Sequence, residues 1–403
     1  MKKLLYITGS RAEYGIMRQL LLQIKQKKEV SLDIVITGMH LLEKYGNTYK
    51  EVEKDFPNSL KVDISIENKS NYDILHSMAI CTEKFAKLFQ EVNYDAILLL
   101  GDRYEILPVA ICAGINNIPI IHIHGGEKTL GNYDEFIRHC ITKISRLHLV
   151  ATEEYKNRVI QLGECPDSVK NLGSLGVYNT LSLKLYSKTE LEKKIGKLEK
   201  PYYVVLFHPE TITGVSLEEQ TTNLLEALQE NLSDYNFVFL GSNSDTGSNV
   251  IEEKISSFVK KYSCYRFPSL TTEEYFSLLK YSSGLIGNSS SGIIEVPSLK
   301  VPTINIGSRQ LGRAKGETVI DCDADVKDIL RAIKYSQTEE YLKILNNSKN
   351  PYFQENILEN YIQKLDPPGV AARNLQECLL LQIEKKISAN KAVSQAANIL
   401  KNQ

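Results

Sequence analysis

The sequence lacks an excess of charge of either sign and any long apolar run. Its 48 basic and 49 acidic residues give a net charge of −1, which offers no general attraction to nucleic acid or to an anionic membrane. No stretch approaches the length of a membrane-spanning helix, and residues 4–7 form too short an apolar run for a signal peptide. We therefore expect a cytoplasmic protein that has neither nucleic acid nor a membrane as partner.

Cysteine spacings typical of metal or disulfide frameworks are also missing. The cysteines are odd in number and contain no CxxC pair; they are Cys81, Cys112, Cys140, Cys165, Cys264, Cys322 and Cys378. This pattern predicts free thiols in a reducing compartment. The sequence has no GxxxxGK[ST] loop and no HExxH motif, which excludes ordinary P-loop ATPase chemistry and a zincin site.

What the sequence does contain is a repeated alternation of short apolar runs with helical patterns. At 403 residues the chain is too long for one ordinary core. Each apolar run ends in a polar loop that mostly carries glycine, and the runs are 4–8, 32–37, 96–100, 118–123, 147–150, 202–207, 236–240, 284–286 and 302–306. Such alternation predicts parallel sheets with right-handed crossovers. We expect an α/β protein with two doubly wound, Rossmann-like domains that face each other across a cleft.

The domain boundaries follow from changes in composition. Residues 166–201 are rich in Lys, Ser, Asn and Leu and show no strong strand, so we expect a linker at 169–200. The first domain then spans 1–168 and the second 201–350, with a return helix at 351–364. Asp366-Pro367-Pro368-Gly369 stops a helix, and an extra helical tail is expected over 365–403. Part of this tail, 365–382, resembles a short piece of the core-binding region of nitrogen-class sigma factors, and we assign it no transcriptional role.

Acidic and imidazole side chains follow two neighbouring runs of the first domain. Asp102 comes directly after run 96–100, while His124, Glu127 and Asp134 follow run 118–123. Groups just past the carboxyl ends of parallel strands converge on one crevice, and carboxylates in different environments suit general acid/base catalysis. The alternative is structural: Asp134 caps a helix, and nearby polar groups pair with one another. We favour catalysis for Asp102 and Glu127, and structural pairing for Glu135, Arg138 and His139.

A metal site drawn from His122, His124, Glu127 and Asp134 is the competing interpretation. Alternation along a strand points both histidines to one face, which favours it. However, no HExxH or facial-triad spacing appears. We therefore predict acid/base use and no metal.

The second domain carries candidates for binding an anion. Residues 287–292, GNSSSG, let a backbone approach a ligand closely before a helix start, although a serine N-cap with Glu295 completing a capping box is an equal alternative. Arg11, Arg103 and Arg309 each follow a strand, and guanidinium groups suit diphosphate oxygens. A lone histidine such as His208 is more often structural, but its place at the end of run 202–207 favours a role in the cleft.

Seven motifs in order together resemble one enzyme family. They are 9–15 (GSRAEYG), 101–103 (GDR), 122–127 (HIHGGE), 134–139, 208–209 (HP), 287–290 (GNSS) and 307–310 (GSRQ). Over residues 1–364 the chain resembles the hydrolysing UDP-N-acetylglucosamine 2-epimerases of bacterial sialic acid biosynthesis. The resemblance implies a glycosyltransferase-B type fold and a hydrolase that converts UDP-GlcNAc and water into N-acetylmannosamine and UDP. It also implies no cofactor, no essential metal, and a homodimer or homotetramer.

The resemblance also assigns residues. Asp102, Glu127 and Asp134 match the family's proton-transfer acids, and His208 matches a histidine beside the uracil diphosphate. Together with Arg103 and Asn243, which follow strands, the expected UDP-binding set is Arg11, Arg103, Asn243, Ser289, Ser290, Glu295 and Arg309. Many relatives have glutamate where this chain has His124, so either Glu127 supplies that carboxylate or His124 transfers the proton itself.

Three other functions compete with this one. A hydrolysing 2-epimerase of UDP-N,N'-diacetylbacillosamine, for legionaminic acid, needs the same scaffold with different groups around sugar C4 and C6. A glycosyltransferase requires an acceptor, and a catalytically inactive UDP-sugar sensor binds without turnover. Loop 127–130, EKTL, favours UDP-GlcNAc by resemblance alone.

Overall fold

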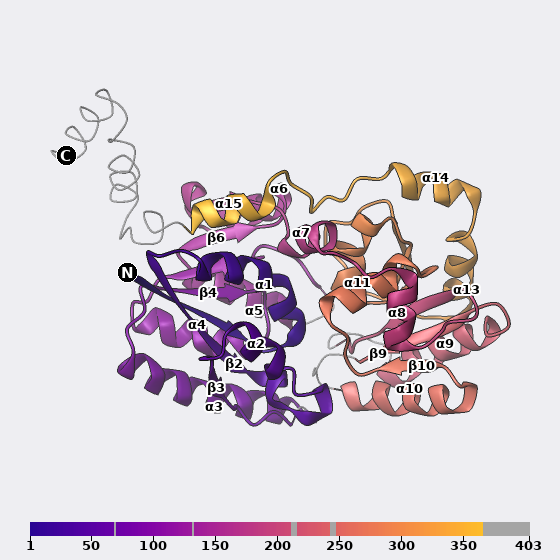
Figure 1. Ribbon diagram of the computed structural model, residues 1–403, viewed down its shortest axis with the longest axis horizontal. Coiled ribbons are helices and arrows are strands. Elements are labelled where there is room, and N and C mark those ends of the chain that lie inside the picture. The colour runs from indigo at the N-terminus through magenta and orange to yellow at the C-terminus, as the bar shows by residue number, and fades with distance from the viewer. Residues whose placement is uncertain (68–69, 131–132, 211–215, 242–246, 366–403) are drawn as a thin grey trace.

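The computed structural model describes the chain except residues 68–69, 131–132, 211–215, 242–246 and 366–403. Two α/β domains lie side by side along the long axis (Figure 1). The predicted tail beyond Leu365 and the candidate Asn243 lie outside the described residues. Within the described part of the chain, no helix combines the length and the apolar character needed to cross a membrane.

The first domain is built on a seven-stranded parallel sheet in the order β3-β2-β1-β4-β5-β6-β7. Its strands are β1 (Lys2–Thr8), β2 (Val30–Thr37), β3 (Leu60–Val62), β4 (Ala96–Leu100), β5 (Ile120–Ile123), β6 (Leu147–Val150) and β7 (Val169–Asn171). The helices between them are α1 (Arg11–Lys25), α2 (Tyr49–Asp55), α3 (Asn71–Glu91), α4 (Ile106–Ile115), α5 (Asp134–Ile144) and α6 (Glu153–Gln161), with short 3-10 turns η1 (Gly38–Leu41), η2 (Glu43–Tyr45) and η3 (Pro166–Ser168).

The second domain repeats this plan with a six-stranded parallel sheet in the order β10-β9-β8-β11-β12-β13. Its strands are β8 (Tyr202–Leu206), β9 (Asn236–Leu240), β10 (Tyr265–Phe267), β11 (Gly284–Gly287), β12 (Thr303–Ile306) and β13 (Val319–Cys322). Its helices are α9 (Leu217–Glu230), α10 (Ser248–Tyr262), α11 (Thr272–Lys280), α12 (Ser290–Ile294), α13 (Val326–Tyr335) and α14 (Glu339–Asn347), with the 3-10 turn η4 (Val296–Leu299). The predicted fold class, two doubly wound domains, is confirmed.

In both sheets the order in which the chain adds strands reverses beside the first strand of the domain. This reversal determines which loops lie at the expected ligand site. β1 pairs with both β2 and β4, and β8 pairs with both β9 and β11. In doubly wound sheets a ligand binds at this switch point, outside the carboxyl ends of the strands. The loops after β1 and β4 in one domain and after β8 and β11 in the other therefore line the expected crevice.

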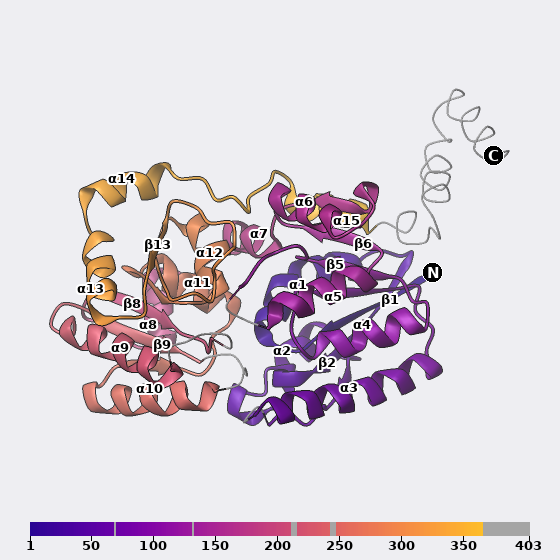
Figure 2. The same cartoon turned by 180° about the vertical axis from the view of Figure 1, so that it is seen from behind.

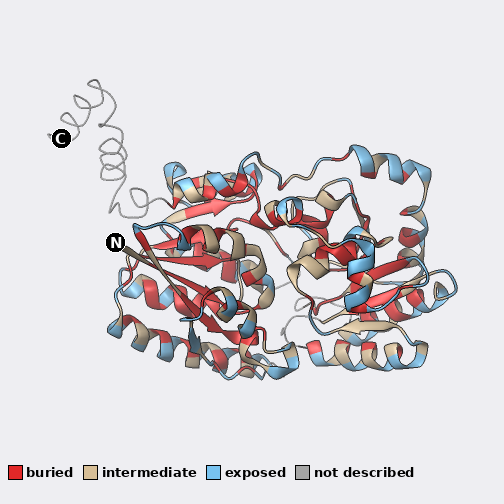
Figure 3. Cartoon of the chain, in the orientation of Figure 1, coloured by how far each residue is buried: buried red, intermediate tan, exposed pale blue. Residues whose placement is uncertain are grey.

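Helices cover both faces of each sheet. In Figure 3 the strands are mostly buried while the exposed residues lie on the outer sides of helices. All five residues of β4, AILLL, are buried, as expected for a central parallel strand with helices on both sides. Leu98 belongs to one apolar cluster, and Ile97 and Leu99 belong to the other. Alternate side chains of β4 therefore pack into the cores on opposite faces of the sheet.

The segment predicted as a linker without a strong strand begins with a short strand, β7. β7 pairs with β6, with Val169 opposite His148, and forms an edge of the first sheet. Its sequence, VKN, is too short and too polar to stand out as an apolar run. The rest of 169–200 contains two helices, α7 (Leu175–Ser182), which packs against α1, and α8 (Lys188–Ile195), whose Leu191 and Ile195 join a core cluster of the second domain.

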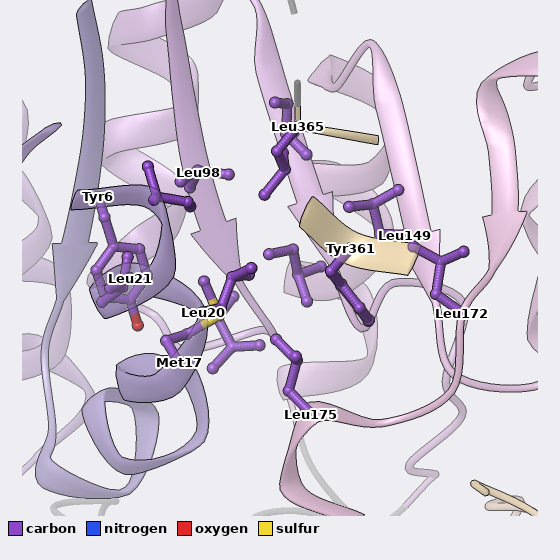
Figure 4. Packing of buried hydrophobic residues seen from close by; sticks show 14 of the residues in the cluster. Tyr6, Met17, Leu20, Leu21, Leu98, Leu149, Leu172, Leu175, Tyr361 and Leu365 are labelled. Atoms are coloured by element: carbon purple, nitrogen blue, oxygen red, sulfur yellow. The ribbon is translucent and has the colours of Figure 1, made fainter. Parts of the chain in front are cut away.

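The chain finally returns to the first domain. After α14 it crosses back, and α15 (Ile357–Lys364) lies beside α1 and α7, as both views in Figures 1 and 2 show. Tyr361 is fully buried and donates its hydroxyl to the carbonyl oxygen of Gly173 at 3.1 Å. Figure 4 shows Tyr361 and Leu365 beside Leu149 and Leu172. The return segment therefore completes the core of the first domain.

Candidate active site

A cleft with two compartments lies between the domains. The larger compartment, about 270 Å³, is lined mainly by residues after β1 of the first domain and after β10 and β11 of the second. The smaller, about 150 Å³, is lined mainly by residues at the ends of β1, β4 and β5 of the first domain. Residues from both domains line both compartments, and the shared ones are Ser10, Ala12, Ile16, Ser290, Glu295 and Arg309.

The smaller compartment holds the predicted acids. Asp102, Glu127 and Asp134 all line it, together with His124. Ser290 and Arg309 of the second domain line the same compartment. Asp134 is the first residue of α5 rather than its cap, because Tyr133 occupies the N-cap position. The loops after β4 and β5 thus bring the acids of one domain against polar groups of the other.

Arg138 holds Asp102 in place. Its Nε donates to Asp102 Oδ2 at 2.9 Å and its Nη2 donates to the same oxygen. The guanidinium is fully buried, and Nη1 also donates to the Glu127 carbonyl oxygen at 2.7 Å. Burial alone raises the pKa of Asp102, but the guanidinium groups of Arg138, Arg313 and Arg309 outweigh it and leave that pKa below its usual range. Asp102 is therefore ionised at neutral pH.

Arg313 holds Glu127, and sequence reasoning missed it. Arg313 Nη2 lies 2.8 Å from Glu127 Oε2, with both side chains more than nine-tenths buried. The two loops also meet through their backbones, since the Leu130 N–H donates to the Leu311 carbonyl oxygen at 3.1 Å. Each of the two central carboxylates of the smaller compartment thus has its own buried guanidinium.

The two histidines of the HIHGGE motif have different surroundings. Both ring nitrogens of His122 have a hydrogen-bonding partner. Nε2 lies 2.7 Å from the Gly101 carbonyl oxygen, and Nδ1 lies 3.1 Å from Thr142 Oγ1. β5 stops at Ile123, and His124 has a positive φ of 62°, so strand alternation no longer relates the two rings. His124 lines the compartment, and burial lowers its pKa although Glu127 opposes that shift. The metal set considered from the sequence does not form, because His122 is used elsewhere.

The three candidate arginines do not gather at one point. Arg309 lines both compartments, and its Nη2 lies 4.0 Å from Asp134 Oδ2. Arg11 lines only the larger one, where its Nε lies 2.8 Å from Glu51 Oε1. Arg103 lines only the smaller one, with its Nε 2.6 Å from Glu105 Oε1. Arg309 is therefore the guanidinium placed at the junction.

Polar loops of the second domain line the larger compartment. Ser289 caps α12 through the Ser291 N–H at 3.4 Å, but Glu295 lies beyond the helix and completes no capping box. Since α12 has only five residues, its dipole is a weak anion site, and Arg309 carries more of the positive charge. His208 is buried in the wall of the larger compartment. Burial lowers its pKa well below the usual value, and the positive charges of Arg309 and Arg103 lower it further.

Two buried carboxyl groups beside the cleft are held in the neutral form. Burial raises the pKa of Glu295 to about 8, and Glu295 lines both compartments. Burial and the neighbouring Glu105 raise the pKa of Glu13 to about 8 as well, and Glu13 Oε2 accepts from the Gly9 N–H at 3.0 Å. Glu13 was not predicted, because an acid in the first turn of a helix is common without any ligand.

Glu13 gives a stability test. Folding raises its pKa, so the stabilisation is greatest below about pH 4.5 and is lost as pH rises through about 8. Between pH 5 and 8 this carboxyl group makes the free energy of unfolding fall, whereas buried histidines with lowered pKa, such as His124 and His208, make it rise. We therefore expect the free energy of unfolding of wild type, relative to that of Glu13→Gln, to fall over this range. Urea unfolding of wild type, Glu13→Gln and the exposed control Glu29→Gln at several pH values measures this. An unchanged slope in Glu13→Gln contradicts the assignment.

Comparisons with known proteins identify the family of this chain. The family model for UDP-N-acetylglucosamine 2-epimerase matches residues 22–366. The polysialic acid biosynthesis protein P7 of Escherichia coli is 54% identical over 364 residues, which cover 90% of this chain and 93% of the relative. The chain belongs to the UDP-N-acetylglucosamine 2-epimerase family.

Other members of the UDP-N-acetylglucosamine 2-epimerase family extend the comparison. The GDP/UDP-N,N'-diacetylbacillosamine 2-epimerase (hydrolyzing) of Campylobacter jejuni is 37% identical to this chain. The aligned region covers 84% of this chain and 88% of the relative. The crystal structure of UDP-GlcNAc 2-epimerase from Neisseria meningitidis bound to UDP-GlcNAc has a TM-score of 0.75 at 18% identity, and covers 90% of this chain and 99% of that one. That structural likeness supports the two-domain fold.

Proposed function

We propose that this protein is a hydrolysing UDP-N-acetylglucosamine 2-epimerase that converts UDP-GlcNAc and water into N-acetylmannosamine and UDP for sialic acid biosynthesis. The observation that carries this proposal is the shared cleft, in which Asp102 and Glu127 face Ser290 and Arg309 across the smaller compartment. The relative named for polysialic acid biosynthesis supports the pathway.

The reaction explains why acids and cations are needed in one place. Loss of UDP from sugar C1 with removal of the C2 proton gives a glycal. Water then adds at C1 while C2 receives a proton on the opposite face, which inverts C2 and yields the free sugar. The steps require a base, an acid and a cation for the departing diphosphate.

The cleft supplies these groups from opposite sides. Asp102, Glu127, Asp134 and His124 form the acid/base set around the pyranose in the smaller compartment. Arg309, Ser289, Ser290 and Glu295, with Arg11 and His208, hold the UDP in the larger compartment and at the junction, and Arg103 contacts the diphosphate from the smaller compartment. Asp102 is ionised beside Arg138 and suits the role of base, whereas His124 is neutral and able to accept or relay a proton.

A second candidate substrate is UDP-N,N'-diacetylbacillosamine, favoured by the 37% identical relative. The decisive experiment incubates the protein separately with each nucleotide sugar and follows free 2-epimer by proton NMR. We expect N-acetylmannosamine from UDP-GlcNAc and little or no product from the diacetylated sugar. Preferential turnover of the diacetylated sugar contradicts the UDP-GlcNAc assignment.

The same incubation separates the two remaining functions. A glycosyltransferase releases no N-acetylmannosamine when acceptor is absent, and an inactive sensor binds UDP without any turnover. We further propose that the enzyme is a cytoplasmic homodimer or homotetramer, without a metal or other cofactor. Light scattering coupled to gel filtration tests the oligomeric state, and activity in the presence of EDTA tests the metal.

A further inference from the structure

A closed ring of hydrogen bonds joins three segments beside the cleft. The backbone N–H of Ala314, the residue after Arg313, donates to Tyr155 Oη at 3.0 Å. Tyr352 Oη donates to the carbonyl oxygen of the same Ala314 at 2.9 Å. The two phenolic oxygens lie 2.6 Å apart, and both tyrosines are fully buried.

Hydrogen-bond donation runs in one direction around the ring, because each tyrosine hydroxyl has a single proton to donate. Tyr352 uses its proton on the Ala314 carbonyl, so Tyr155 donates to Tyr352 and accepts from the Ala314 N–H. Every donor in the ring then has an acceptor. Removal of either hydroxyl leaves one backbone group of Ala314 without this partner, and an unpaired polar group away from water is costly.

The three segments come from separate parts of the molecule. Tyr155 lies on α6 of the first domain, Ala314 in the loop after β12, and Tyr352 in the crossing segment between α14 and α15 (Figure 1). The crossing segment is itself fixed to both domains. The Ser174 N–H donates to the Tyr352 carbonyl oxygen at 3.0 Å, and Asn350 Nδ2 donates to the Ile294 carbonyl oxygen at 2.7 Å.

The same helix also supports the loop that carries Glu127. Arg158 of α6 donates through Nη1 to the Gly126 carbonyl oxygen at 2.6 Å. Gly126 packs so closely on α6 that a Cβ there would lie 2.5 Å from the Tyr155 carbonyl oxygen. Helix α6 therefore fixes Glu127 on one side, and Tyr155 with Tyr352 fixes the loop of Arg313 on the other.

We propose that Tyr155 and Tyr352 are positioning residues whose hydroxyl pair holds the Ala314 backbone and thereby keeps the Arg313 guanidinium against Glu127. The inference rests on the proposed function, in which Glu127 belongs to the acid/base set. Neither tyrosine is among the residues that line the two compartments, so they act through Arg313. The crossing segment between α14 and α15 thus supports chemistry in the first domain.

Tyr352→Phe tests this directly. We expect kcat for release of N-acetylmannosamine to fall about tenfold or more while KM changes less than about twofold, because the ground state binds as before. Tyr202→Phe is the matched control, since buried Tyr202 donates to the Leu278 carbonyl oxygen at 2.6 Å away from the cleft. Equal losses in the two variants, or an unchanged kcat in Tyr352→Phe, overturn the inference.

A double-mutant cycle shows whether Tyr352 acts through Arg313. In an Arg313→Lys background, where the side chain no longer presents a planar fork to Glu127, Tyr352→Phe is expected to lower kcat no further. Fully additive losses overturn the proposal. Tyr155→Phe is expected to match Tyr352→Phe in kcat, and it serves as the second variant if Tyr352→Phe folds poorly.

The proposed function and this inference fail in different ways. Wild-type turnover of UDP-GlcNAc decides the function. A crystal structure of Tyr352→Phe decides the positioning role even if the wild type turns over neither sugar. Movement of Arg313 Nη2 out of hydrogen-bonding distance of Glu127 Oε2 supports the inference, and a retained contact overturns it.

Discussion

Asp102→Asn is expected to lower turnover of UDP-GlcNAc by about two orders of magnitude or more, the usual worth of an acid/base group, while UDP affinity stays nearly unchanged. The carboxylate lines the smaller compartment, whereas Arg11, His208 and Ser289 of the proposed UDP-binding set line only the larger one. Arg138 and its neighbours keep the pKa of Asp102 low, so wild type presents an anion that the amide cannot replace. Steady-state kinetics and calorimetric titration with UDP measure the two effects separately.

A matched control separates catalysis from loss of an ion pair. Asp55 also pairs with a guanidinium, through Arg18 Nη2 at 3.2 Å, but it does not line the cleft. We expect Asp55→Asn to retain near-native turnover and Glu127→Gln to behave like Asp102→Asn. Near-native turnover in Asp102→Asn or Glu127→Gln shows that the assignment of that residue is wrong.

Arg138→Met is expected to reduce the free energy of unfolding by about 3–5 kcal/mol, the usual cost of removing one partner from a buried ion pair. The guanidinium is fully buried, and its loss leaves Asp102 without its closest cation and the Glu127 carbonyl without a donor. Asp102 also loses the two hydrogen bonds that fix its position, so activity should fall as well. Urea unfolding at neutral pH measures the change in stability.

Arg18→Met supplies the comparison for that measurement. Arg18 pairs with Asp55, but about a third of its side chain is exposed. Solvent screens such a pair, so we expect a loss of only about 1 kcal/mol or less. If Arg138→Met costs no more than Arg18→Met, then Arg138 is not the structural anchor of the acid/base set.

The strands that the sequence did not predict share a physical cause. β3, β7, β10 and β13 are the outermost strands of the two sheets. Each is three or four residues long and includes a charged side chain, as in LKV and YRF. An edge strand is covered less completely than a central one, so its sequence need not be a continuous apolar run. The central strands, such as β4, carry that run and were predicted.

The same distinction applies to the site. Asp102 was predictable because residues after neighbouring parallel strands converge on one crevice, and Ser290 and Arg309 follow neighbouring strands of the second sheet in the same way. Their meeting follows from the expected arrangement of two domains that face each other across a cleft. The roles of Arg138 and Arg313 were not predictable, because the carboxylate that each guanidinium contacts depends on how a loop or helix packs in three dimensions. Local spacing suggested that Arg138 pairs with Glu135, and it does at 3.0 Å, but its bonds to Asp102 are invisible in the sequence.

The return of the chain to the first domain was predicted as a helix, but its consequences were not. The sequence predicts a return helix at 351–364 but does not identify the residues that this helix contacts. The structure places α15 in the core of the first domain and Tyr352 beside the Arg313 loop. Such contacts come from the path of the whole chain and leave no local pattern.

The measurement that tests the account most directly is the reaction of UDP-GlcNAc in D₂O, with no acceptor present, followed by NMR. Removal and return of the C2 proton by groups in contact with solvent predicts N-acetylmannosamine with deuterium at C2, together with UDP. Release of N-acetylglucosamine, or of N-acetylmannosamine that keeps its original C2 proton, contradicts the account.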